Sequence, residues 1–336
     1  MSAKNERPTA KDDVRHVENV MVRAQHASRW YGQIVGCNDL TLEIGPGILG
    51  LLGPNGAGKS TLMKLMTGQL RPSKGTVEVL GERVWDNRAL LRRIGYCPEH
   101  EGVYEDLTGL EFVAFMTELS GFSPDEARER ATRALADMDL AAAQDRRMGE
   151  YSKGMRQRAK LAQAFAHDPQ VIFLDEPLTG CDPLARVRVI EIIKRLGKDG
   201  RCVIVSSHVL HEIEAMTSEI VLIHKGQVLA EGNVYEIREM IDRHPHQIRV
   251  ACDEPRALAT ALVADQAVLG IGFDAMDART VLVETRQPDA CYPLIPAAAR
   301  KAGVKIASLT SPDNNLAAVF RYLTEEKQAQ AGVQNR

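Results

Sequence analysis

The stretch "GPNGAGKST", from Gly53 to Thr61, constrains the fold of this chain more than any other part of the sequence. It fits the pattern G-x-x-x-x-G-K-[ST] and lies between an apolar run, "GILGLL", and a helical pattern, "TLMKLMTGQL". A strand, a glycine-rich turn and a helix in this order form a P-loop, whose backbone N–H groups and helix N-terminus surround a triphosphate. We expect Lys59 to reach the β- and γ-phosphates and Ser60 to offer its hydroxyl group to Mg²⁺. The residues predicted to bind the triphosphate here are Gly53, Pro54, Asn55, Gly56, Ala57, Gly58, Lys59, Ser60 and Thr61.

The stretch "VIFLDEP" supplies the acidic residues that a P-loop requires. It predicts a buried strand ending in Asp175, which we expect to hold the water shell of the Mg²⁺ ion. Glu176 follows directly and is the candidate general base that polarises the attacking water. A capping or solvated role for this carboxylate is the less favoured alternative.

The order of the predicted elements indicates an α/β protein with a mixed, mainly parallel sheet. Short apolar runs such as "VIFLDE", "CVIVSSH" and "EIVLIHKGQVLAEG" alternate with helical patterns, as in buried parallel sheets. Strand signals stop between about Leu107 and His167, where successive helical patterns predict a helical insertion. Beyond about His244 the order β-α-β-β-α-β predicts a small ferredoxin-like α+β domain, closed by a last helix from about Asn315 to Glu325.

The predicted domain boundaries follow these changes of pattern. We assign 1–18 to a flexible tail, 19–243 to the nucleotide-binding domain with its helical part at about 100–168, 244–325 to the accessory domain, and 326–336 to a second tail.

Composition argues against several classes of protein. The formal net charge of −3 gives no overall attraction to nucleic acid, and no run approaches the roughly 18 apolar residues of a membrane-spanning helix. The cysteines form no C-x-x-C pair and no secretory signal precedes them, which favours reduced, buried thiols over disulfides or zinc ligands. They are Cys37, Cys97, Cys181, Cys202, Cys252 and Cys291.

Several further motifs resemble those of the ATP-binding cassette (ABC) ATPases, over roughly Asn19 to Asn233. The stretch "YSKGMRQR" lies in the position of that family's signature, and "PLTGCDP" resembles its D-loop. His208 in "IVSSHVLHE" resembles the switch histidine that senses the γ-phosphate. Tyr31 in "SRWYGQ" resembles the aromatic residue that stacks on adenine, with Trp30 as the rival candidate.

The resemblance implies an ATPase subunit that works as a dimer. In the family the signature closes onto ATP held by the P-loop of a second cassette, so Ser152 and the Gly154 backbone would face a γ-phosphate in trans. Asp182 in the D-loop is counted with the nucleotide-binding residues, and His208 with Glu176 as catalytic. The implied cofactors are ATP and Mg²⁺. The implied partners are a second cassette, forming a homodimer, and integral membrane transporter subunits that hold the protein at the cytoplasmic face of the cell membrane, with no nucleic acid expected.

Two positions depart from the family pattern. The usual signature glycine and glutamine are Lys153 and Met155 here, a variant similar to many bacterial export-type cassettes. In "IGYCPEHEG", Glu99 stands where the family usually has the glutamine that touches Mg²⁺ and relays nucleotide state to the transport subunit. Ionised glutamate offers only acceptors and adds negative charge. Glu99 is therefore the weakest of the three metal candidates, after Ser60 and Asp175, and a coupling role is the alternative.

Three basic residues, Lys153, Arg156 and Lys160, fall together on one face of the helix predicted after the signature. The pattern leaves a solvated basic face and a functional role equally open.

The leading hypothesis is the ATPase subunit of a membrane transporter, with export as the direction, because one complete cassette accompanies no predicted membrane span. The stretch "SPDNNLAAVFRYLT" resembles the close of bacterial export cassettes. The alternative is a soluble ATP-driven switch that acts on ribosomes, DNA or another protein, although such proteins usually carry two cassettes or a long coiled-coil insertion. A cassette that binds ATP without turnover is disfavoured, because Lys59, Asp175, Glu176 and His208 are all present.

Overall fold

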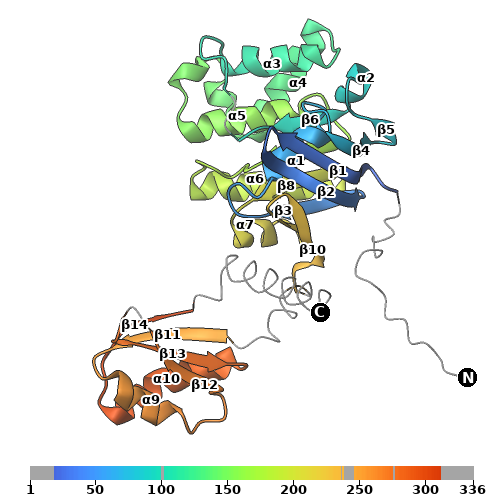
Figure 1. The fold of residues 1–336 in the computed structure, drawn as a ribbon. Coiled ribbons are helices and arrows are strands. Elements are labelled where there is room, and N and C mark those ends of the chain that lie inside the picture. Colours follow the sequence, from blue (N-terminus) through green and yellow to red (C-terminus); the bar gives the residue numbers. More distant parts are fainter. Residues whose placement is uncertain (1–18, 100–101, 236, 238–245, 275–276, 312–336) are drawn as a thin grey trace, which may run out of the picture. The chain divides into compact units, whose positions relative to one another are not determined.

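The computed structural model describes residues 19–99, 102–235, 237, 246–274 and 277–311. The chain divides into two compact units, Met1–Glu231 and Gly232–Arg336, and each is described by itself (Figure 1). The predicted tails and the predicted last helix lie outside the described residues. The domain boundaries placed from sequence patterns remain predictions.

A six-stranded sheet forms the centre of the first unit. β3 pairs in parallel with β8 and β9, β8 pairs in parallel with β7, and β7 with β6. Every residue of β7 and β8 is buried, as expected for strands covered on both faces. The prediction of a mainly parallel sheet is therefore confirmed. In spatial order the strands are β10 (Gln227–Asn233), β9 (Glu219–His224), β3 (Gly47–Leu52), β8 (Cys202–Ser207), β7 (Val171–Asp175) and β6 (Ile94–Cys97).

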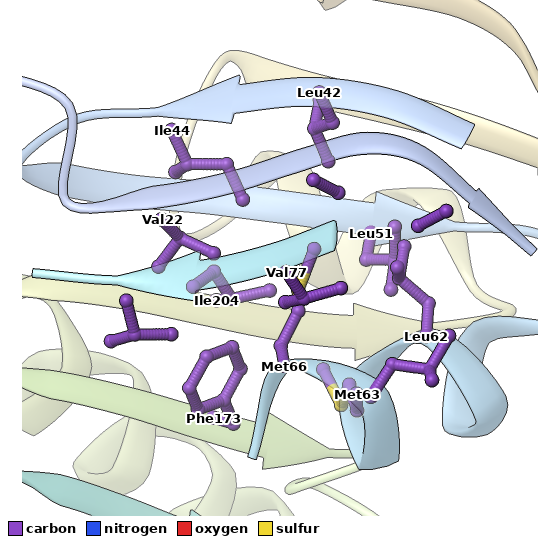
Figure 2. Packing of buried hydrophobic residues seen from close by; sticks show 14 of the residues in the cluster. Val22, Leu42, Ile44, Leu51, Leu62, Met63, Met66, Val77, Phe173 and Ile204 are labelled. Atoms are coloured by element: carbon purple, nitrogen blue, oxygen red, sulfur yellow. The ribbon is translucent and has the colours of Figure 1, made fainter. Parts of the chain in front are cut away.

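A second, antiparallel sheet in this unit was not recognised as separate from the sequence. Its order is β2 (Ile34–Ile44), β1 (Val22–Tyr31), β4 (Lys74–Val79) and β5 (Glu82–Arg83). Helix α1 (Lys59–Met66) contributes Leu62 and Met66 to a buried cluster that also contains Val22 from this sheet and Phe173 from the parallel sheet (Figure 2). Each fully buried side chain of this size contributes about 1.5–3 kcal/mol. Both sheets therefore hold the helix that follows the P-loop.

The predicted helical insertion is confirmed. It consists of α3 (Gly109–Leu119), α4 (Pro124–Asp137) and α5 (Lys153–Phe165), with short 3₁₀ helices at Ala141–Ala143 and Met148–Glu150. Capping boxes begin α3 at Thr108 and α4 at Ser123, where they satisfy N–H groups that have no partner inside the helix. The unit also contains α2 (Arg88–Leu91), α6 (Pro183–Lys198) and α7 (Leu210–Glu214). Across the described part of both units, no helix is long and apolar enough to cross a membrane.

The second unit has the predicted ferredoxin-like order. Its elements are β11 (His246–Cys252), α9 (Pro255–Leu262), β12 (Gly270–Phe273), β13 (Thr280–Thr285), α10 (Pro288–Ala302) and β14 (Ile306–Thr310). The antiparallel sheet runs β12-β13-β11-β14, so the first and third strands of the motif are central. Its core joins Ile248 and Val283 of the sheet to Leu258 of α9 and Ile295 of α10.

All six cysteines are free and buried. Burial raises the pKa of Cys37, Cys97 and Cys202 to about 12. These thiols stay protonated near neutral pH, where only the thiolate reacts. The prediction that all six cysteines are buried is confirmed.

Candidate nucleotide-binding and catalytic site

The P-loop lies at the carboxyl end of β3 and leads into α1. Gly58, the residue before the helix, has φ = 108°, and a Cβ there would lie 2.5 Å from the carbonyl oxygen of Gly36. Only glycine satisfies both conditions without strain. The loop borders a cavity of about 400 Å³ whose wall includes all the predicted P-loop residues from Pro54 to Thr61. Gly53 lies at the buried base of the loop and contacts Lys59 through its carbonyl oxygen.

Lys59 is buried and forms the cationic centre of this cavity. Its Nζ atom donates a hydrogen bond to the carbonyl oxygen of Gly53 at 2.7 Å and lies 3.6 Å from Oε1 of Glu176. A lysine held at the base of a glycine-rich turn is suited to compensate phosphate charge. The structure thus brings two of the predicted site residues into contact.

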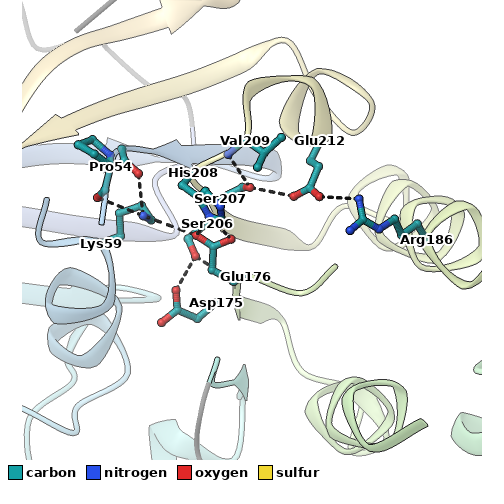
Figure 3. A network of polar contacts seen from close by, with 11 residues as sticks. Pro54, Lys59, Asp175, Glu176, Arg186, Ser206, Ser207, His208, Val209 and Glu212 are labelled. Atoms are coloured by element: carbon teal, nitrogen blue, oxygen red, sulfur yellow. Dashed lines mark hydrogen bonds and ion pairs between the residues drawn. The ribbon is translucent and has the colours of Figure 1, made fainter. Parts of the chain in front are cut away.

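The two acidic residues at the end of β7 have carboxylates with different partners, although both residues bond to the same serine (Figure 3). Ser206 on β8 is the parallel-strand partner of Asp175, and its hydroxyl group donates to the Asp175 carboxylate. The same hydroxyl oxygen accepts a hydrogen bond from the Glu176 N–H at 3.0 Å. Glu176 adopts φ = 49°, an uncommon conformation for a residue with a side chain and one that clusters at functional sites.

His208 completes the contact set around Glu176. Its Nδ1 atom lies 3.0 Å from both carboxylate oxygens of Glu176, although its side chain is half exposed. The imidazole can therefore touch the carboxylate with one side while the other side faces outward. The structure thus places the two predicted catalytic residues in contact, and their catalytic roles remain predictions.

A polar network next to His208 was missed by the sequence analysis. The Ser207 hydroxyl accepts from the N–H of Val209 at 3.0 Å and donates to Glu212 at 2.9 Å. Glu212 in turn accepts from Arg186 of α6 at 3.0 Å (Figure 3). The network ties the turn that carries His208 to α6. The sequence did contain a signal for this network: two serines end the otherwise apolar strand in "CVIVSSH".

The two candidates for adenine stacking lie in different surroundings. Tyr31 lines the nucleotide cavity, its hydroxyl group is 3.4 Å from Oγ1 of Thr61, and the Arg29 guanidinium lies 5.3 Å from its ring centre. Trp30 instead lies under the ammonium group of Lys74, at 5.5 Å. Successive residues of a strand point to opposite faces. The geometry therefore favours Tyr31 over Trp30 as the stacking residue.

Replacing Tyr31 with alanine is expected to weaken ATP binding. Stacking of an aromatic side chain on a base is worth about 1–3 kcal/mol, so the Kd for ATP should rise roughly 5- to 150-fold by isothermal titration calorimetry. Trp30→Ala is the matched control and should change the Kd less than about twofold. A larger effect of the Trp30 variant would reverse the assignment.

Ser152 and Gly154, which are predicted to act in trans, and the D-loop residue Asp182 lie outside the wall of this cavity. Ser152 caps α5 by accepting from the Met155 N–H at 3.2 Å, and Asp182 caps α6 by accepting from the Ala185 N–H at 2.9 Å. Gly154 lies close to the D-loop, because a Cβ there would be 2.8 Å from the carbonyl oxygen of Gly180. Ser152 and Asp182 are exposed, each at the start of a helix.

A solvated role for Lys160 is wrong. Lys160 is 8% exposed, and its ammonium group donates to the carbonyl oxygens of Pro98 at 2.8 Å and Glu99 at 2.9 Å. Lys153, by contrast, is exposed, and Arg156 donates to the Tyr151 carbonyl oxygen. The three basic residues do not form one solvated face.

The oxygen atoms around the cavity fit a magnesium ion held together with phosphate. Ser60, Asp175 and Glu99 all line it, and hydroxyl and carboxylate oxygens are ligands that Mg²⁺ accepts. Within the described residues, no cluster of three or more histidine, cysteine or acidic side chains could hold a metal by itself. Mg²⁺ is usually bound by one or two protein ligands plus phosphate oxygens.

The fold and the site together define a nucleotide-binding cassette: a mainly parallel sheet, a P-loop, an Asp-Glu pair and a histidine that contacts the glutamate. Comparisons with known proteins identify its family. The family model described as ABC transporter matches residues 37–179. An ABC transporter ATP-binding protein of Nostoc sp. is 41% identical over 214 residues, 62% of this chain and 63% of that protein. The daunorubicin resistance ATP-binding protein DrrA3 of Streptomyces coeruleorubidus is 31% identical over 300 residues, 89% of this chain and 94% of that protein. The chain belongs to the ABC transporter ATP-binding protein family.

Solved structures show the same cassette fold. The structure of an ATP-binding subunit of an ABC transporter is 29% identical, with a TM-score of 0.61 over 66% of this chain and 92% of that chain. A dimeric structure of a bacterial ABC transporter cassette is 24% identical, with a TM-score of 0.60 over 64% of this chain and 99% of that chain. The chain covers less than two thirds of the length of the Nostoc relative.

Proposed function

We propose that this chain binds ATP with Mg²⁺, hydrolyses it, and powers export by a membrane transporter. One observation carries the proposal: at the P-loop cavity, Glu176 lies 3.6 Å from Nζ of Lys59 and 3.0 Å from Nδ1 of His208. A buried carboxylate between an ammonium group and an imidazole can accept a proton from water where a γ-phosphate is bound.

Each residue has one task in the proposed reaction. Lys59 compensates the phosphate charge, and Ser60 and Asp175 would hold the metal ion. Bound Mg²⁺ would neutralise charge on the β- and γ-phosphate oxygens. Glu176 accepts the proton of the attacking water, while His208 orients the Glu176 carboxylate.

We further propose that two copies of this chain complete the site. Ser152, Gly154 and Asp182 lie outside the cavity wall of their own chain, and Ser152 and Asp182 are exposed at helix N-termini. Helix N-termini favour anions by about 0.3–1 kcal/mol. A γ-phosphate bound by a partner copy is the ligand that such an arrangement suits, and one of the similar cassettes is described as dimeric.

A second pocket, of about 590 Å³, is the proposed docking site for the membrane subunit. It lies between β6 and the helical insertion, and its wall includes Arg88, Arg92, Tyr104 and Phe112. The Tyr104 side chain is 57% exposed and packs edge-on near Phe115, with ring centres 6.0 Å apart. Exposed aromatic and arginine side chains are the types enriched at protein interfaces. Docking here would keep the chain at the inner face of the membrane through its partner.

The proposed direction of transport, export, rests on the description of a related protein. The Streptomyces relative, which spans most of both chains, is described as a daunorubicin resistance protein. Resistance of this kind is consistent with outward transport of the drug.

Co-purification from host membranes tests the proposed function. Tagged Glu176→Gln protein, extracted in mild detergent with ATP and Mg²⁺, should carry a multi-span membrane protein in stoichiometric amount. Tyr104→Ala, placed in the same background, should reduce that recovery without changing ATP binding, because Tyr104 lines the second pocket and is not part of the nucleotide cavity wall. Recovery solely in the soluble fraction, with ribosomes, nucleic acid or no partner, would reject the transporter and favour a soluble ATP-driven switch.

A further inference from the structure

We propose that Lys160 is a positioning residue that holds the turn at Pro98 and Glu99 between the two pockets, and that its charge offsets the charge of Glu99. This inference rests on the proposed function, because it assumes nucleotide binding at one pocket and partner docking at the other.

Side chains from α5 and the residues after it cover the free edge of the parallel sheet. β6 is the edge strand, paired with β7 alone in the six-stranded sheet that the structure describes. In a parallel ladder, carbonyl groups of alternate residues point away from the neighbouring strand. The carbonyl oxygens of Ile94, Tyr96 and Pro98 are therefore left for other partners. They are contacted by His167 Nε2 at 3.0 Å, Gln163 Nε2 at 2.7 Å and Lys160 Nζ at 2.8 Å, in that order.

Lys160 differs from the other two partners in its charge. Gln163 is neutral, and burial lowers the pKa of His167, which keeps its imidazole neutral at pH 7. Lys160 alone places an ammonium group at this edge, and this group also bonds to the carbonyl oxygen of Glu99 at 2.9 Å. A buried ammonium group is costly unless an opposite charge or several acceptors compensate it.

The turn that Lys160 holds borders a nucleotide pocket rich in carboxylates. Glu99, Asp175 and Glu176 all line that pocket, so three carboxylates face the site proposed for an anionic triphosphate, together with the single lysine Lys59. Negative charges that share one partly buried pocket repel one another, and water and salt screen that repulsion only weakly. The proposed effect of the Lys160 ammonium group, which bonds to the backbone of Glu99, is to reduce that repulsion.

The same turn forms part of both pockets. Pro98 and Lys160 line the second pocket, and Glu99 lines the nucleotide pocket. A displacement of this two-residue turn would therefore change both walls. Lys160 anchors the turn to α5, the helix that Ser152 caps, so the signature, the turn and the docking pocket are mechanically linked.

A double-mutant cycle on the purified full-length protein tests the inference. Lys160→Met removes the charge and keeps the aliphatic stem, and Gln163→Met is the control that removes an equivalent bond without removing a charge. We expect Lys160→Met to raise the KM for MgATP roughly tenfold with Glu99 present, but less than about threefold in a Glu99→Gln background. Gln163→Met should have the same small effect in both backgrounds. Lys160→Gln, which keeps N–H donors, replaces Lys160→Met if thermal unfolding shows that the latter does not fold.

The outcomes separate the two proposals. Equal effects of Lys160→Met in the two backgrounds, with an active unmutated protein, would reduce Lys160 to a structural residue and overturn the inference. An unmutated protein that neither binds nor hydrolyses ATP would refute the proposed function, and the inference with it.

Discussion

Exchanging Glu176 for glutamine is expected to slow ATP hydrolysis by a factor of about 10² to 10⁴ while ATP still binds. Glutamine matches glutamate in size but is not basic, so the proton of the attacking water loses its acceptor. Its amide also offers one acceptor oxygen where the carboxylate offers two, which weakens the contact with Nδ1 of His208. The measurement is phosphate release at saturating MgATP, with the Kd from calorimetry.

The same variant should accumulate as an ATP-bound dimer, because the step that separates the two copies is blocked. Size-exclusion chromatography with and without ATP would show this shift. Glu191→Gln, on the exposed face of α6, is the matched control and should keep the unmutated rate. Turnover at the unmutated rate by the Glu176 variant would remove this residue from the role of general base.

Replacing Lys59 with alanine is expected to abolish most of the affinity for ATP. Hydrogen bonds to charged groups contribute about 1.5–3 kcal/mol, so losing this ammonium group should raise the Kd roughly 10- to 150-fold. Glu176, which is 5% exposed, would also lose the cation 3.6 Å away and would add uncompensated negative charge to the cavity. Both effects raise the Kd for ATP.

Lys64→Ala provides the control for this second prediction. Lys64 belongs to the same helix as Lys59 but is absent from the wall of the nucleotide cavity. Its replacement should leave the Kd within about twofold. An unchanged Kd in the Lys59 variant, with thermal unfolding showing an intact fold, would disprove the assignment of the P-loop to ATP.

Local patterns were enough to predict the elements that follow from periodicity and turn chemistry. The P-loop, the apolar strand before Asp175 and the capped start of α4 at Ser123 are fixed within a few residues of sequence, and the structure confirms all three. The order of elements in the second unit likewise predicted its ferredoxin-like sheet. For the P-loop, the strand and the helix start, the signal and the structure share the same short segment, so no distant contact was needed.

Long-range contacts decided the remaining features. The antiparallel sheet depends on pairing of β1 with β4, two segments separated by the P-loop and α1, which periodicity cannot report. The choice of Tyr31 over Trp30 depended on which face of β1 borders the cavity. Ser206 became a partner of Asp175 and Glu176 because β7 and β8 pair in one particular register.

Lys160 shows most clearly what the sequence pattern could not predict. In the sequence it belongs to a basic helix face that is as consistent with solvent as with function. The packing of α5 against an edge strand places its ammonium group on the carbonyl oxygens of Pro98 and Glu99. The chemical groups proposed to bind ATP could be listed from the residue types and their spacing. Which of these groups contact one another depends on the folded chain, because burial and pairing between distant segments select the partners of each charge.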